Sequence, residues 1–129
     1  MANELKYGEQ IHLQNGYNGW QGGYLDTNGH ASDSQKAAGA KYDVSTSQGR
    51  DRAAGTGRWR IFARTSDPAD GTVRAGDVVH LWNTYGDNGG FLETNHTSSA
   101  SGAKYDLCTN AYYNRSSDVA DWKIHRAQA

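Results

Sequence analysis

Two short polar motifs contain the residue types that could do chemistry in this chain. The first is Asp26-Thr27-Asn28-Gly29-His30, which recurs as Glu93-Thr94-Asn95-His96. Each copy places a carboxylate, a hydroxyl, an amide and an imidazole close together in sequence. A ligand with adjacent hydroxyl groups needs such a mixture, because each hydroxyl both donates and accepts hydrogen bonds. The alternative is a polar turn, in which the same side chains bond to their own main chain and close a hairpin.

The second motif is Gly-Ala-Lys-Tyr-Asp, which is identical at 39–43 and 102–106. Its aromatic ring could stack on the apolar face of a ligand while its carboxylate accepts hydrogen bonds. The alternation of the strand offers another interpretation, since it puts Tyr42 on the same face as Val44 and therefore in the core. The lysine and aspartate would then be an exposed pair of little energetic weight. The candidate contacts in this motif are Tyr42, Asp43, Tyr105 and Asp106.

Two tryptophans lie in or beside loops rich in glycine and asparagine. Trp20 lies within NGYNGWQGG, and Trp82 begins WNTYGDNGG. Both are candidate ligand contacts, because aromatic side chains add contact area at a low cost in conformational entropy. A lid over one end of a barrel is the other interpretation. Trp59 and Trp122 differ, because both lie in W-x-I segments that predict core positions.

The sequence predicts no metal, no cofactor and no catalysis. The histidines lack H-x-H or H-E-x-x-H spacing, so zinc is unsupported, and His12 and His80 should bond to nearby main-chain groups. Calcium held by Asp26 and Asn28 stays open as an alternative. No nucleophile elbow or phosphate-cradling loop is present, and the single cysteine, Cys108, stands where the other copy has a serine. The sequence therefore predicts a binding protein and not an enzyme.

The elements that must position these residues occur twice in the chain. Residues 8–61 and 76–124 align with identical residues at many positions, and the length differences fall in polar stretches that read as loops. Each copy predicts four short strands, because apolar and polar residues alternate between Gly, Asn, Asp and Ser boundaries. Matched pairs include His12/His80, Leu13/Leu81, Asn15/Asn83, Leu25/Leu92, Arg52/Arg115 and Trp59/Trp122. The two arginines should either bond to loop carbonyls or contact a ligand.

Composition supports one all-β domain spanning residues 1–129. Four Trp and eight Tyr compensate for a low aliphatic content, which indicates an ordered protein with an aromatic-rich core. The net charge of −1 argues against nucleic acid as the partner, since phosphate binding requires a basic patch. No apolar run approaches the length of a membrane span, about 20 residues. A polar N-terminal segment predicts a cytoplasmic protein, or one exported without a signal peptide.

The order of motifs in each copy is VhLxN, GG-Y-L-D-T, KYDV and then W-x-I. It resembles the four-strand unit of β-trefoil proteins of the MIR and ricin-B families. That resemblance implies that Asp26 and Glu93 occupy the position of the acidic residue that holds the sugar, and that the third-strand tyrosine stacks on it. The chain departs from the pattern in lacking the Q-x-W ending and in showing two units where a trefoil has three. GGYLDT and GTG-x-W-x-I also resemble the β-prism-type domain of bacterial perforin-like toxins. A pseudo-twofold barrel or prism of short strands is therefore expected.

The hypothesis from sequence is a lectin with two related sites, one per copy, which gain avidity when both bind one glycan surface. The alternative is a protein–protein or membrane-targeting module of a bacterial toxin-like system. Glycans or glycoconjugates are the expected partners, and a homo-oligomer is compatible with the sequence. The predicted ligand-binding residues are Trp20, Asp26, Asn28, His30, Tyr42, Asp43, Trp82, Glu93, Asn95, His96, Tyr105 and Asp106.

Overall fold

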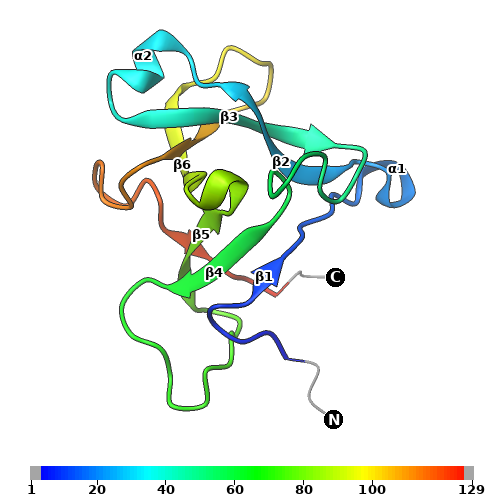
Figure 1. Cartoon of the computed structure of the whole chain (residues 1–129), viewed down its shortest axis with the longest axis vertical. Coiled ribbons are helices and arrows are strands. Elements are labelled where there is room, and N and C mark those ends of the chain that lie inside the picture. Colours follow the sequence, from blue (N-terminus) through cyan, green and yellow to red (C-terminus); the bar gives the residue numbers. More distant parts are fainter. Residues whose placement is uncertain (1–3, 127–129) are drawn as a thin grey trace.

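The computed structural model, which describes residues 4–126, is an antiparallel β-sheet curled into a half-barrel (Figure 1). The prediction of an all-β fold is confirmed at this level. The strands are β1 (Gln10–Ile11), β2 (Tyr24–His30), β3 (Ala40–Ser47), β4 (Trp59–Ala63), β5 (Val78–Asn83), β6 (Gly90–Thr97), β7 (Tyr105–Asn110) and β8 (Trp122–Lys123). The helical elements are single turns, namely α1 (Tyr17–Trp20), α2 (Asp33–Lys36) and η1 (Tyr85–Asp87). None of these helices is long and apolar enough to cross a bilayer.

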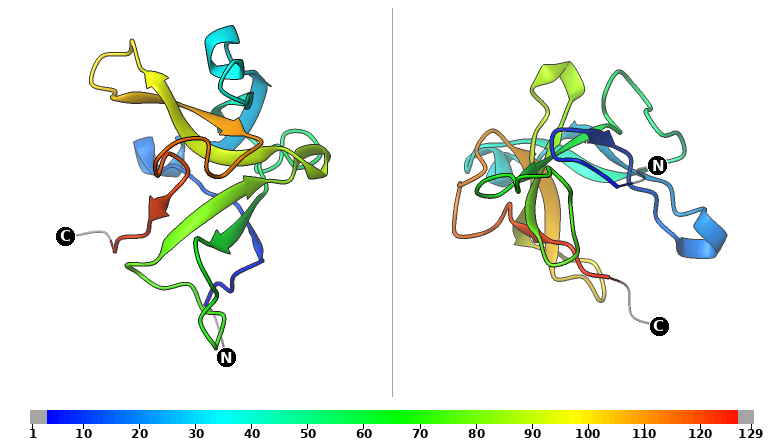
Figure 2. Two further views of the ribbon diagram at one scale, coloured as in Figure 1. Left: turned by 90° about the vertical axis from the view of Figure 1, so that its left-hand side faces the viewer. Right: turned by 90° about the horizontal axis from the view of Figure 1, so that it is seen from below.

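Seven strands follow one another in the order β1-β4-β5-β6-β7-β3-β2, and β8 pairs with β5 off this path. The β4–β5 pair joins the two halves of the chain, with Ile61 opposite Leu81. The hairpins β2–β3 and β6–β7 also lie side by side, because β3 pairs with β7. Figure 2 shows the β2–β3 and β6–β7 hairpins at one end of the molecule and the β4–β5 pair at the other. All of these pairings are antiparallel.

The Gly-Gly pairs before β2 and β6 are required by close main-chain approach. Gly23 and Gly90 both have positive φ, at 89° and 97°. A Cβ on Gly23 would lie 2.8 Å from the carbonyl oxygen of Ser47, and one on Gly90 would lie 2.8 Å from that of Asn110. Only glycine adopts this conformation at so short a distance without strain. The tight turn at each pair is therefore set by the backbone itself.

The helical turn α2 starts with a capping box. The Ser32 hydroxyl accepts from the Gln35 main-chain N–H at 3.2 Å, and the Gln35 side chain accepts in return from the Ser32 N–H at 3.0 Å. The turns α1 and η1 lie in stretches that the sequence indicates only as loops. Each contains residues with positive φ, Asn18 and Gly19 in α1 and Gly86 in η1, so neither has the 3.6-residue period that reveals a helix.

The first strand is shorter than its sequence pattern predicts. Only Gln10 and Ile11 pair with β4, although the alternation continues to residue 15. Beyond that point the chain bonds to the start of β2 instead. The carbonyl of Leu13 accepts from Leu25 N–H at 2.8 Å, and Asn15 N–H donates to the carbonyl of Gly23 at 2.8 Å. The segment therefore stays extended but changes its partner.

The core is thin and is centred on Trp59, Ile61, Val79, Leu81 and Leu92. Trp59 is fully buried as predicted, whereas Trp122 is only half-buried. The difference arises because β4 has a strand on both sides and β8 has one on a single side. Both indoles nevertheless donate to main-chain carbonyls of the neighbouring hairpin, at 3.0 Å and 2.9 Å.

The expectation for His12 and His80 is confirmed. The Nδ1 atom of His12 lies 2.9 Å from the carbonyl oxygen of Gly57, and that of His80 lies 2.9 Å from the carbonyl oxygen of Ala120. Because a carbonyl oxygen only accepts, Nδ1 carries the proton in both contacts. The two histidines therefore anchor the loops that precede β4 and β8.

Candidate functional site

The two carboxylates predicted to hold a ligand lie in the interior of the protein. Asp26 and Glu93 are fully buried, and each is paired with an arginine that follows in sequence. The Nε atom of Arg52 lies 3.3 Å from Asp26 Oδ2, while that of Arg115 lies 2.9 Å and 3.0 Å from the two oxygens of Glu93. Neither carboxylate reaches the surface. The expectation from sequence is corrected here, because loops distant in sequence cover the outer face of both hairpins.

Glu93 is the centre of a satisfied buried network. Its Oε2 atom accepts from Asn95 Nδ2 at 2.8 Å, from Asn110 Nδ2 at 3.2 Å and from the Cys108 thiol at 3.5 Å. Asn95 is itself buried, although it forms part of the lining of a surface pocket beside His96 and Tyr105. Burial, followed by the charge of Glu93, raises the pKa of the Cys108 thiol to about 12. Glu93 and Cys108 are therefore fully buried within the hairpin and not open to solvent.

Asp26 has fewer partners than Glu93. Its Oδ1 atom has no hydrogen-bond partner in the part of the chain that the structure describes. The amide in the same motif, Asn28, is exposed. The arginines also donate to main-chain carbonyls, Arg52 to Thr27 at 2.9 Å and Arg115 to Thr94 at 3.0 Å. Of the two roles expected for these arginines, the geometry shows structural bonding, but the carbonyls belong to strands β2 and β6 and not to loops.

The predicted histidines and tyrosines meet in two shallow pockets. The Tyr42 pocket, of about 230 Å³, is lined by His30, Tyr42, Tyr85 and Arg52 among others. His30 stacks on Tyr42 with ring centroids 5.7 Å apart, and Tyr85 approaches at 5.6 Å with its ring perpendicular. These neighbours leave little of the Tyr42 ring free for a ligand.

The second of these, the Tyr105 pocket, of about 560 Å³, contains the sequence equivalents Tyr105, His96 and Arg115. Tyr105 is 58% exposed, and His96 is exposed with a φ of 76°. The ring of Tyr105 is therefore more open to solvent than the ring of Tyr42. The two pockets share residue types but differ in how much of the tyrosine a ligand could reach.

The structure does not place the remaining predicted residues in these pockets. Asp43 and Asp106 are exposed on the paired strands β3 and β7. Partial burial raises the pKa of Asp43, the main-chain N–H of Val44 opposes that rise, and the charge of Asp106 adds to it. Lys41 donates to the carbonyl of Asn88 at 2.5 Å. Trp82 is half-buried on β5, opposite Phe91 of β6.

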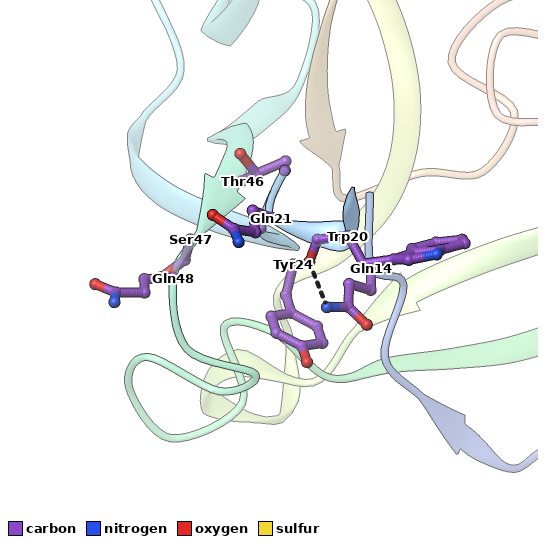
Figure 3. A pocket seen from close by; sticks show the side chains of 9 residues that line it. Gln14, Trp20, Gln21, Tyr24, Thr46, Ser47 and Gln48 are labelled. Carbon is purple, nitrogen blue, oxygen red and sulfur yellow. Dashed lines mark hydrogen bonds between the residues drawn. The ribbon is translucent and has the colours of Figure 1, made fainter. Parts of the chain in front are cut away.

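Trp20 borders a separate groove of about 570 Å³, which we call the Trp20 groove (Figure 3). It lies between α1, the start of β2 and the end of β3. Figure 3 shows Tyr24 between Gln14 and the Ser47–Gln48 turn, with the indole of Trp20 at one end of the groove and directed outward. The lining residues are Gln14, Trp20, Gln21, Gly22, Gly23, Tyr24, Thr46, Ser47 and Gln48.

Trp20 is held in a conformation that bulky side chains seldom adopt. Its φ is 68°, in the left-handed region, yet the residue is 65% exposed and fills no core space. Its main-chain N–H donates to the carbonyl oxygen of Gly16 at 3.2 Å, and its own carbonyl oxygen accepts from Gln14 Nε2 at 3.0 Å. The indole also packs on Gly16, where a Cβ would lie 3.3 Å from the ring. The surrounding chain therefore imposes this strained position on an exposed aromatic residue, a pattern associated with binding sites.

All the side chains that line the Trp20 groove are uncharged. Three are amides, three carry hydroxyl groups and two are aromatic, with tyrosine counted in both of the last two groups. A charged residue adjoins the lining, because the Nε atom of Arg50 donates to the Tyr24 hydroxyl at 3.3 Å and its guanidinium lies 5.9 Å from the ring centroid. Such a lining can donate and accept hydrogen bonds and can stack on an apolar face. None of the lining side chains itself carries a charge that would attract an ionic ligand.

Most residues of the groove were not predicted from the sequence. Gln14, Tyr24 and Gln48 come from three separate segments, and our sequence argument relied on motifs present in both copies. The groove is not repeated, because the aligned residues of Gln14 and Tyr24 are Trp82 and Phe91. The clustering of Gln, Tyr and Trp near the Gly22-Gly23 pair is the signal that could have indicated it.

Comparison with known proteins adds no family to this description. No protein-family model and no curated protein matches the chain. Within residues 4–126, no group of three or more His, Cys, Asp or Glu side chains is positioned to hold a metal ion. The functional argument therefore depends on the geometry of the groove and the two pockets.

Proposed function

We propose that this protein is a lectin that binds neutral carbohydrate in the Trp20 groove and does not transform it. The observation that carries the proposal is Trp20 itself. A large aromatic side chain is kept exposed, in a strained backbone conformation, at the end of a groove lined by amides and hydroxyls. Strain of this kind typically costs about 1–3 kcal/mol, and it persists where the surroundings impose it.

The lining of the groove fits the chemistry of a sugar. Glutamine amides present a donor and an acceptor in one plane, and the hydroxyls of Tyr24, Thr46 and Ser47 can act as either. A pyranose also has an apolar face of C–H groups, which can pack on an aromatic ring. The absence of charge among the lining residues favours neutral sugars over uronic acids, sialic acids and sugar phosphates.

The Tyr105 pocket is the better candidate for a second contact. Its tyrosine is exposed, whereas that of the Tyr42 pocket is covered by His30. Two weak contacts on one molecule increase the avidity for a surface that displays many glycans. In this proposal the ligand sites are two but unlike, in place of the two matched sites that the repeated motifs predict.

We also propose that the fold consists of two copies of one four-strand unit of β-trefoil type. Two features support this. Strand pairings correspond, since β1–β4 matches β5–β8 and β2–β3 matches β6–β7. Aligned side chains also make corresponding hydrogen bonds. The indoles of Trp59 and Trp122 donate to the second strand of each unit. The imidazoles of His12 and His80 bond to the loop before the fourth strand of each unit.

The proposal is tested by a glycan array followed by titration calorimetry with the sugars that bind. We expect Trp20→Ala to weaken binding at least tenfold, about 1.4 kcal/mol, the loss typical of an aromatic residue that anchors a ligand. Stability should change little, because Trp20 is largely exposed. The intrinsic fluorescence of the wild type should also respond to the sugar.

Tyr17→Ala is the matched control. Tyr17 lies on the same turn, α1, is 78% exposed and does not line the groove. Its removal should leave sugar affinity unchanged. The proposal fails if no neutral glycan binds to the wild type, or if the two variants bind with equal affinity.

A further inference from the structure

The junction between the two halves of the chain buries a defined set of apolar residues. At the β4–β5 pair, Ile61 lies opposite Leu81 and Trp59 lies opposite Asn83. Trp59, Ile61, Val79 and Leu81 are all buried there. Each of these two strands has a partner on both sides, since β4 also pairs with β1 and β5 also pairs with β8. The junction therefore shows that the fourth strand of one unit pairs with the first strand of the next and buries their apolar residues.

The same residue types recur at the two outer strands, where they are not fully covered. Leu13, the equivalent of Leu81, is 39% exposed, and Ile124, the equivalent of Ile61, is half-buried. Ile11 and Trp122 are half-buried as well, although Val79 and Trp59 at the matching positions are buried. Position for position, residues that are buried at the junction are therefore partly exposed at the ends.

The outer strands also lack a neighbour on one edge. Strand β1 pairs with β4, and β8 pairs with β5, but no described strand lies on the other edge of either. Figure 2 shows β1 and β8 on either side of the β4–β5 pair. An open strand edge presents unpaired N–H and C=O groups that can pair with another chain. By sequence, β8 corresponds to β4 and β1 corresponds to β5, so the two open edges are complementary.

We propose that two copies of this chain associate through these edges, with β8 of each copy pairing with β1 of the other. The inference rests on the sequence equivalence of the two units and is independent of sugar binding. The register of the junction transfers directly, and it places Ile124 opposite Leu13 and Trp122 opposite Asn15 of the partner. A twofold axis satisfies both edges of both copies at once, as in other isologous dimers.

The number of strands in the resulting barrel matches one that side chains can fill. Each copy contributes the run β1-β4-β5-β8, so a dimer contains eight such strands. At about eight strands the interior of a barrel is just wide enough to be filled by side chains. The half-exposed residues Ile11, Leu13, Trp122 and Ile124 would supply that filling.

Sedimentation equilibrium or light scattering across a concentration series tests the proposal. The wild type should show a species of twice the 14.1 kDa chain mass. Leu13→Glu and Ile124→Glu should each raise the dissociation constant at least about tenfold, because each would bury a charge at the new strand pair. Phe62→Glu is the matched control, since Phe62 is 37% exposed on β4 but lies away from the open edges. It should leave the dimer unchanged.

A cross-link keeps the test independent of how well the glutamate variants fold. Leu13→Cys combined with Ile124→Cys, in a Cys108→Ser background, should form a disulfide-linked dimer under mild oxidation. Leu13→Cys combined with Phe62→Cys should not. A wild type that stays monomeric at every concentration overturns the proposal, as does a dimer in which the Leu13–Ile124 pair fails to cross-link.

Discussion

The buried pair of Arg115 and Glu93 gives a direct test of how this interior is held together. We expect Arg115→Met to lower the free energy of unfolding by about 3–5 kcal/mol, the usual cost of leaving one partner of a buried ion pair without its counter-charge. Glu93 is fully buried, and the Arg115 side chain is only 19% exposed, with Nε 2.9 Å from Oε1. Small domains have about 5–15 kcal/mol in total, so this loss is a large share of the stability.

Arg52→Met is the matched control, because Arg52 occupies the equivalent position beside Asp26. Its side chain is 41% exposed, and its Nε approaches a single carboxylate oxygen at 3.3 Å. Water screens this pair more strongly, so we expect a loss of about 1–2 kcal/mol. Both carboxylates are equally buried, so the difference between the two variants measures what the closer contacts and the lower exposure of Arg115 contribute.

Urea denaturation followed by tryptophan fluorescence measures both losses. With a slope near 2 kcal/mol per molar urea, a loss of about 4 kcal/mol moves the midpoint by about 2 M. A loss below about 1 kcal/mol for Arg115→Met would refute the reasoning. So would equal losses for the two arginines, because the geometry of the two pairs would then have no energetic consequence.

Three further predictions concern single groups. Cys108 should react with a thiol reagent no faster than the protein unfolds, because burial and then the charge of a neighbouring carboxylate raise its pKa to about 12. Gly57→Ala should cost about 2 kcal/mol or more in urea unfolding, because its Cβ would overlap a main-chain carbonyl oxygen, while Gly49→Ala, with open space around it, should cost little. The Tyr7 hydroxyl donates a hydrogen bond to the Asp77 carboxylate and lowers its pKa. The stability from this bond is therefore present above the ordinary pKa of 3.8 and is lost as the pH falls through the lowered pKa of the folded state. Tyr7→Phe should therefore reduce the loss of stability below pH 3.8 in acid titrations, and an unchanged acid limb would contradict this.

Local patterns in the sequence were enough to place the strands. The alternation of apolar and polar residues predicts four short strands in each copy, because side chains of a strand point to opposite faces with a period of two, and eight strands form, with β1 shorter than its pattern. Gly23 and Gly90 mark the turns into β2 and β6 because their φ values are positive there. The burial of Trp59 also followed from its W-x-I segment. Each of these properties depends on the residue and its immediate neighbours in the chain.

Only the tertiary structure decided which polar residues are free to bind. Asp26 and Glu93 lie on strands whose outer faces would be exposed in an isolated hairpin. The loops that contain Arg52 and Arg115 fold over those faces, where Thr27 N–H donates to Thr56 and Thr94 N–H to Val119. Burial depends on what packs against a residue, and here that is a segment more than twenty positions away.

The same reason accounts for the Trp20 groove. The sequence by itself determined that Trp20 lies in a polar loop beside a tight glycine turn. The fold decided that Thr46, Ser47 and Gln48, from the far end of β3, complete the lining next to Tyr24. A strand pair brings these segments together through main-chain hydrogen bonds, which carry no residue signature. The sequence therefore determined the strand segments and the glycine turns, and the contacts between elements decided where a ligand can bind.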